Sequence, residues 1–89
     1  MELKKQIKRS TKEGRTIIGS KETLKNIDDL EKVIIASNSP EDIIEKIETS
    51  VNDETDIVRF EGNNSDLGSL CGKPFNVATV GIRKKQSLV

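Results

Sequence analysis

The stretch that decides the fold is Val33-Ile34-Ile35-Ala36-Ser37-Asn38-Ser39-Pro40, an uninterrupted apolar run followed by turn residues. A run that is apolar on both faces is typical of a central strand covered on each side by other elements. Pro40 fits the first position of a following helix, with Ser39 as the capping residue before it. The sequence therefore predicts a buried strand over residues 33–36 and a helix directly after its polar turn.

Apolar residues recur at helical spacing after Pro40, and this pattern supports the predicted helix: Ile43, Ile44, Ile47 and Val51. Further helices are predicted over residues 2–12 and 20–28, and Ser20 is the predicted cap of the second. A short helix is predicted within residues 63–71, with one of Asn64, Ser65 and Asp66 as its cap. Further strands are predicted over 15–18, 56–60 and 77–82. Alternating helices and strands favour a sheet with helices on both faces, a three-layer α/β/α sandwich in a single domain over residues 1–89.

The charges are segregated along a chain whose formal net charge is zero. Residues 1–25 carry eight basic and three acidic side chains, residues 26–66 three basic and twelve acidic, and residues 67–89 four basic and none acidic. If the two ends of the chain meet in space, they build a basic face that the net charge conceals, as a nucleic-acid-binding protein requires. The alternative is a set of solvated helix faces with no partner.

Composition excludes several classes of site. The chain has no histidine and one cysteine, Cys71, so it offers no Cys/His zinc site, no Ser-His-Asp or Cys-His catalytic group and no intramolecular disulfide. We expect neither a cofactor nor a small-molecule substrate. The N-terminus lacks an apolar signal core and no segment approaches a membrane span, so we expect a soluble, cytoplasmic protein that is not an enzyme.

Three segments carry candidate binding residues. The first is Gly19-Ser20-Lys21-Glu22-Thr23-Leu24-Lys25, at a predicted strand-to-helix turn where backbone N–H groups attract anions. Lys21 and Lys25, four residues apart on one helix face, can flank a phosphate backbone. The alternative is a capped helix with solvated lysines.

The second segment is the turn around Asn38, and the third is the loop Leu67 to Val77. Asn38 offers a donor and an acceptor to a base edge, although local turn bonding is its more common role. Gly68, Gly72 and Pro74 indicate a shaped loop, in which Phe75 can stack on an unpaired base. Phe75 can equally be a core residue, and we interpret Cys71 as a small buried apolar residue.

These segments resemble the thirty-e family of large-subunit ribosomal proteins, within the kink-turn-binding superfamily. The resemblance rests on Gly14–Lys25, Val33–Pro40, Phe60-Glu61-Gly62 and Asp66–Val77, in this order and spacing. Its most specific part is the leucine-glycine-x-x-cysteine-glycine-lysine-proline run from Leu67 to Pro74. Ser20-Lys21, where relatives in guide-RNA particles usually carry asparagine-glutamate, favours the ribosomal branch.

The resemblance implies an α/β/α sandwich around a four-stranded mixed sheet, and binding of kink-turn RNA, an internal loop that bends a duplex sharply. By this resemblance Lys21, Asn38 and Phe75 fall at the family's RNA-contacting lysine, asparagine and phenylalanine. The predicted RNA-binding set is completed by neighbours in the same segments: Gly19, Ser20, Lys25 and Lys73. The expected partners are ribosomal RNA and other ribosomal proteins.

The chain departs from the family pattern in three places. The connection Asn26–Lys32 is short and lacks the family's glycine. This connection also carries Asp28, Asp29 and Glu31, at positions where relatives tend to be basic. Near the C-terminus, Arg83-Lys84-Lys85-Gln86 replaces the family's aspartate-proline-glycine turn. Two other functions remain open at this point. One is a kink-turn protein of a non-ribosomal particle or regulatory leader, and the other is a protein-interaction module that uses the acidic middle segment without RNA.

Overall fold

Helices and strands alternate along the described part of the chain, as the sequence predicts. The computed structural model describes residues 2–51, 53 and 55–84. Its elements are α1 (Glu2–Lys12), β1 (Thr16–Ile18), α2 (Ser20–Lys25), the 3-10 helix η1 (Ile27–Asp29), β2 (Leu30–Ile35), α3 (Glu41–Ser50), β3 (Asp56–Arg59), α4 (Asn64–Leu70) and β4 (Thr79–Arg83).

The four strands form one mixed sheet in the order β1-β4-β2-β3. Strand β4 runs antiparallel to both β1 and β2, whereas β3 runs parallel to β2. The apolar run therefore lies in an interior strand, as predicted. Its side chains alternate between two cores, with Val33 and Ile35 in one and Ile34 and Ala36 in the other.

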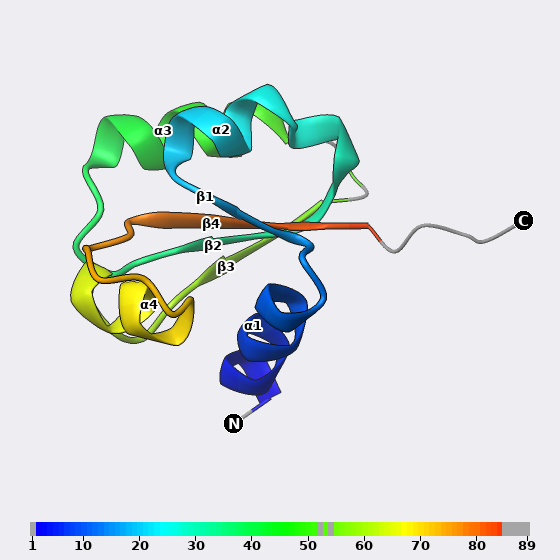
Figure 1. Ribbon diagram of the computed structural model, residues 1–89. Helices are drawn as coiled ribbons and strands as arrows, with labels where there is room; N and C mark the ends of the chain where they lie inside the picture. The colour runs from blue at the N-terminus through cyan, green and yellow to red at the C-terminus, as the bar shows by residue number, and fades with distance from the viewer. Residues whose placement is uncertain (1, 52, 54, 85–89) are drawn as a thin grey trace, which may run out of the picture.

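Helices cover both faces of the sheet, so the predicted three-layer α/β/α sandwich is confirmed (Figure 1). On one face α2 and α3 cover the sheet, with the fully buried Ile47 of α3 against β2 residues. On the other face α1 and α4 contribute Ile7 and Leu67 to a core with Val80 and Ile82 of β4. Burial of these aliphatic side chains is the main favourable term for folding.

The predicted caps of α2 and α3 are wrong. The carbonyl of Gly19 accepts the first helical bond from the Thr23 N–H at 3.0 Å, so α2 begins at Ser20 and the Ser20 side chain makes no capping bond. The Ser39 hydroxyl instead donates to the Ala78 carbonyl at 3.1 Å, and Pro40 occupies the N-cap position of α3. At α2 the backbone of Gly19 takes the place of the expected side-chain cap. At α3 the expected capping side chain, Ser39, bonds to a residue distant in sequence.

Other boundaries differ by a few residues. Helix α2 ends at Lys25 rather than near residue 28, because Asn26 closes it by donating its side-chain amide to the Glu22 carbonyl. Strand β2 starts at Leu30, three residues early. The predicted cap of α4, one of Asn64, Ser65 and Asp66, is also wrong: Asn63 caps this helix and forms a capping box with Asp66. Strand β4 starts at Thr79, since the N–H of Val77 bonds to Asn64 at the start of α4 instead of to a strand.

The two ends of the chain meet in the sheet. Thr16 of β1 is paired with Ile82 of β4, and the Arg83 N–H donates to the Arg15 carbonyl at 2.8 Å. Lys85, part of the expected basic C-terminus, lies outside the described residues. Within them, no helix combines the length and apolar character that crossing a membrane requires.

Candidate nucleic-acid interface

Three loops that carry the predicted binding residues lie at the same end of the sheet. Strands β1 and β2 both run antiparallel to β4, so their carboxyl ends and the amino end of β4 share one edge. The β1–α2, β2–α3 and α4–β4 connections all leave from that edge, at the left in Figure 1. We call this edge, with its three connections, the loop end. It is the position at which ligands commonly bind in open α/β sheets.

Hydrogen bonds tie the three connections together. The Gly19 N–H donates to the Thr79 carbonyl at 2.9 Å, which joins the first connection to the start of β4. The carbonyl of Ala78 accepts from the Ala36 N–H at 2.8 Å and from the Ser39 hydroxyl at 3.1 Å. These hydrogen bonds fix the positions of the three connections relative to one another.

The β1–α2 connection turns at Gly19, which has a φ of 98°. This region of backbone space is open to glycine and strained for other residues, whatever the space around the Cβ position. The turn places Ser20 at the start of α2 and leaves Lys21 and Lys25 exposed, one helical turn apart. Neither lysine forms an ion pair within the described residues, so both charges are available to an anionic ligand.

In the β2–α3 connection, Asn38 is exposed and its amide orientation is fixed. Its Oδ1 accepts a hydrogen bond from the backbone N–H of Asn64 at 2.9 Å. Since a backbone N–H can only donate, the atom that faces it must be the oxygen, and Nδ2 points elsewhere. Nδ2 has no partner among the described residues, so Asn38 presents both Nδ2 donors to a ligand, while the Asn64 N–H uses one of the two acceptor positions of Oδ1.

The α4–β4 connection is shaped by close backbone contact. A Cβ atom added to Gly68 would collide with the Phe75 carbonyl oxygen and lie 3.4 Å from the Val77 nitrogen. The Lys73 N–H donates to the Gly68 carbonyl at 3.0 Å, which folds the loop back on the end of α4. Glycine at position 68 is thus a requirement for the loop to lie where it does.

This loop exposes the side chains of Lys73 and Phe75. Phe75 is 56% exposed and is the large apolar side chain that the described part of the protein leaves in solvent. The alternative interpretation of Phe75 as a core residue is therefore wrong. Lys73 forms no ion pair with the described acidic residues.

Cys71 is buried, as predicted, with 2% of its surface exposed. Burial raises the pKa of its thiol, and the nearby charge of Lys73 and a hydrogen bond with Thr11 only partly oppose this effect. A protonated, enclosed thiol is a packing group, not a nucleophile.

All seven predicted residues therefore lie in the connections at the loop end or in the helix that begins there. Sequence reasoning missed Asn64, whose backbone N–H orients Asn38 and whose carbonyl holds the Val77 N–H at 2.9 Å. The sequence separation between Asn38 and Asn64 gives no local pattern that would reveal this contact. The two hydrogen bonds of Asn64, with Asn38 and with Val77, hold β2, α4 and β4 in position relative to one another.

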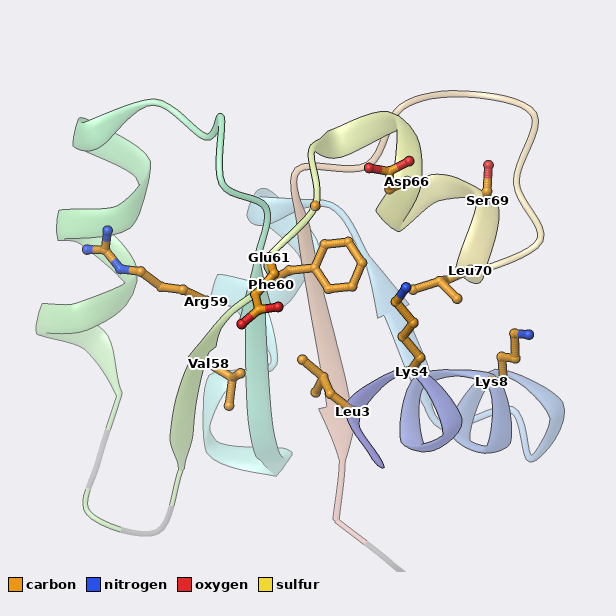
Figure 2. Close-up of a pocket in the computed structure, with 11 residues that line it drawn as sticks. Leu3, Lys4, Lys8, Val58, Arg59, Phe60, Glu61, Asp66, Ser69 and Leu70 are labelled. Carbon is orange, nitrogen blue, oxygen red and sulfur yellow. The ribbon is translucent and has the colours of Figure 1, made fainter. Parts of the chain in front are cut away.

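The structure also has an open groove of about 910 Å³ between α1, β3 and α4 (Figure 2). Leu3, Phe60 and Leu70 form apolar parts of its wall, and Lys4 and Lys8 extend from α1 over it. None of the seven predicted binding residues lines it. Among the described residues no cluster of acidic or cysteine side chains is suited to hold a metal ion.

Comparison with known proteins gives a family match over almost the entire chain. The model of the ribosomal protein L7Ae/L30e/S12e/Gadd45 family matches residues 1–88. The large ribosomal subunit protein eL30 of Archaeoglobus fulgidus is 42% identical over 81 residues, which cover 89% of this chain and 91% of that protein. The eL30 of Methanothermobacter thermautotrophicus is 38% identical, with 93% and 88% covered.

Among solved structures, a 15.5 kD RNA-binding protein of Giardia lamblia has a similar fold. The two superpose with a TM-score of 0.76 over 94% of this chain and 72% of the other, at 23% sequence identity. This likeness supports the α/β/α architecture and the strand order described above.

Proposed function

Because the chain belongs to the ribosomal protein L7Ae/L30e/S12e/Gadd45 family, and within it to the eL30 proteins, we propose that it is a structural constituent of the large ribosomal subunit. In this role it binds ribosomal RNA, specifically a kink-turn, through the loop end, and contacts other ribosomal proteins in the cytoplasm. Its family is one of ribosomal proteins and not of enzymes.

The observation that carries the proposal is the arrangement of Lys21, at the start of α2, with Asn38 and Phe75, on the β2–α3 and α4–β4 connections at the same end of the sheet. Each supplies a different kind of contact. The lysine neutralises a phosphate, the asparagine donates to an acceptor on a base edge, and the phenylalanine stacks on an unpaired base. An internal loop in a sharply bent duplex offers all three partners within a short distance, whereas a regular duplex keeps its bases paired and stacked.

The amide orientation of Asn38 narrows the contact it makes. Its oxygen accepts a hydrogen bond from the Asn64 N–H, and it offers two Nδ2 donors to the RNA. A base edge with acceptor atoms, such as the O6 and N7 of a guanine, fits these donors. Gly19 and Ser20 bring α2 close to the phosphate backbone, while Lys25 and Lys73 add positive charge on either side.

Two measurements test the proposal. In a gel-shift titration at matched salt, we expect the protein to bind a kink-turn RNA more tightly than a plain RNA duplex of equal length. Equal affinities would remove specific recognition and leave only a basic surface. In a high-salt gradient of cell lysate, we expect the protein to sediment with large ribosomal subunits. Kink-turn binding without co-sedimentation would indicate a role in another RNA particle.

A further inference from the structure

A second cationic surface lies on α1, outside the loop end. Five basic side chains of this helix are exposed: Lys4, Lys5, Lys8, Arg9 and Lys12. We call them the α1 cationic face. They recur at i, i+4 spacing in two adjacent rows and span about 12 Å of helix, at about 1.5 Å per residue. The opposite side of α1 is apolar and packs on the sheet through Leu3 and Ile7.

This surface lies mostly away from the loop end, which α1 approaches where Thr11 hydrogen-bonds Cys71 of the α4–β4 connection. Helix α1 lies on the sheet face opposite α2 and α3 (Figure 1). Strand β1 runs toward the loop end and starts at Thr16, four residues after the last residue of α1. The carboxyl end of α1, with Arg9 and Lys12, therefore lies toward the other end of the sheet.

The α1 cationic face works against the stability of the helix that carries it. Lys4–Lys8, Lys8–Lys12 and Lys5–Arg9 are like-charge pairs at i, i+4, which destabilise a helix. Lys4 and Lys5 also occupy the first turn, where the helix dipole disfavours positive charge, whereas Arg9 and Lys12 occupy the last turn, where the dipole favours it. Local features that oppose the fold are typical of functional sites.

Ion pairs among the described residues do not neutralise these charges, although Glu61 and Asp66 line the same groove as Lys4 and Lys8. None of the five cations forms an ion pair with an acidic side chain that the structure describes. Glu13, which follows α1, binds Arg15 at 2.8 Å instead. The exposed acidic residues of α3, namely Glu41, Asp42, Glu45 and Glu48, belong to the helix layer on the far side of the sheet. An external polyanion can therefore bind these cations without first breaking an ion pair that the structure describes.

We propose that the α1 cationic face is a second RNA-binding surface, which holds the phosphate backbone of an RNA helix separate from the one at the loop end. Five cations without an exposed aromatic or aliphatic side chain among them suit a phosphate backbone, which is recognised through charge. Protein interfaces instead bury aromatic and apolar anchors at their centre and are depleted in lysine. With one RNA segment bound at the loop end and another on the α1 cationic face, the protein would hold two RNA segments together.

The test uses the full chain already saturated with an unlabelled kink-turn RNA that has short flanking stems. A fluorescent plain RNA duplex is then titrated in at several salt concentrations. We expect the saturated protein to capture the duplex, with an affinity that falls steeply as salt rises. Failure to capture it, or displacement of one RNA by the other, would overturn the proposal.

The decisive variant is Lys5→Gln, Arg9→Gln, Lys12→Gln, because glutamine keeps nearly the helix propensity of lysine and arginine. Losing three phosphate contacts should make the slope of log K against log salt shallower by about 2.7 for the duplex, at about 0.9 per contact. Affinity for the kink-turn should stay within about twofold, since these residues are outside the loop end. The denaturation midpoint should change little, because the removal of like-charge pairs offsets the loss of Arg9 and Lys12 from the last turn of α1. A slope equal to that of the wild type would overturn the proposal.

Two controls complete the design. Lys46→Gln removes an exposed cation from α3 and should leave capture of the duplex unchanged. Phe75→Ala should weaken the kink-turn complex and still allow duplex binding, so the failure of one proposal can be told from that of the other. Poly-glutamate at matched charge should compete weakly. Competition equal to that of the RNA would overturn the assignment to RNA and identify an acidic protein as the partner.

Discussion

Phe75 and Phe60 are the two aromatic residues of the chain, and their environments are opposite. Phe75 is 56% exposed at the loop end, whereas Phe60 is 4% exposed in the core beneath α1 and α4. If Phe75 stacks on an RNA base, Phe75→Ala should reduce binding to a kink-turn by about 1–3 kcal/mol. Its effect on the free energy of unfolding should be small, since the side chain has little packing to lose.

Phe60→Ala is the matched control for this substitution. It deletes the same side chain from a buried site and should lower the free energy of unfolding by about 3–5 kcal/mol. Denaturant midpoint and RNA affinity are measured on both variants. A large midpoint drop for Phe75→Ala, with affinity intact for the folded fraction, would make Phe75 structural and leave Lys21 and Asn38 to carry the site.

For Asn38, one substitution separates its role in holding the loop from its role in binding. Asn38→Asp keeps an oxygen that can accept from the Asn64 N–H, but it removes the Nδ2 donors and adds a negative charge. We expect fold stability close to wild type and a loss of about 1.5–3 kcal/mol in binding, measured by gel shift with a kink-turn RNA.

Asn38→Ala removes the bond to Asn64 as well. It should therefore lower the free energy of unfolding by about 0.5–1.5 kcal/mol in addition to weakening binding. If Asn38→Asp bound RNA as tightly as the wild type, the asparagine would serve only to tie β2 to α4, which is its local structural role.

At the scale of elements, strand polarity explains why the predicted binding residues lie toward one end of the sheet. The apolar run followed by a polar turn predicted β2 and the loop after it. The alternation of helices and strands predicted the three-layer architecture. Once β1 and β2 share a direction, the connections after them must share an edge. The caps of α2 and α3 were predicted wrongly because the competing bonds involve backbone geometry at Gly19 and a partner, Ala78, far from Ser39 in sequence. Local patterns do not contain such contacts.

The α4–β4 connection allows a test at the same scale. In Gly68→Ala the new methyl group would meet the Phe75 carbonyl oxygen, and because backbone cannot rotate away, the loop must shift. We expect a loss of about 1–3 kcal/mol in stability and weaker RNA binding, as Lys73 and Phe75 move with the loop. Ser69→Ala, at the exposed neighbouring position of α4, should change neither. Unchanged RNA affinity in Gly68→Ala would show that the loop position does not matter for binding.

At the scale of the whole molecule, a net charge of zero conceals a strongly uneven distribution. Exposed lysines lie at the loop end and exposed cations on α1, while α3 exposes four acidic side chains and a single lysine. An approaching polyanion responds to the local field rather than to the total charge. The protein should therefore bind RNA with the salt dependence of a basic protein, although its sequence pI is about 6.3.

The double variant Lys21→Gln, Lys25→Gln tests this at the loop end. Each phosphate contact that is lost should make the slope of log K against log salt shallower by about 0.7–0.9 for kink-turn binding. Glutamine has a helix propensity close to that of lysine, so α2 should persist. Lys46→Gln changes the net charge by one unit among the acidic residues of α3 and should leave the slope unchanged.

If the double variant keeps both the affinity and the slope of the wild type, Lys21 and Lys25 are solvated side chains and the phosphate contacts lie elsewhere. If Lys46→Gln alters the slope as much per charge, then net charge, and not the position of the lysines at the loop end, controls binding.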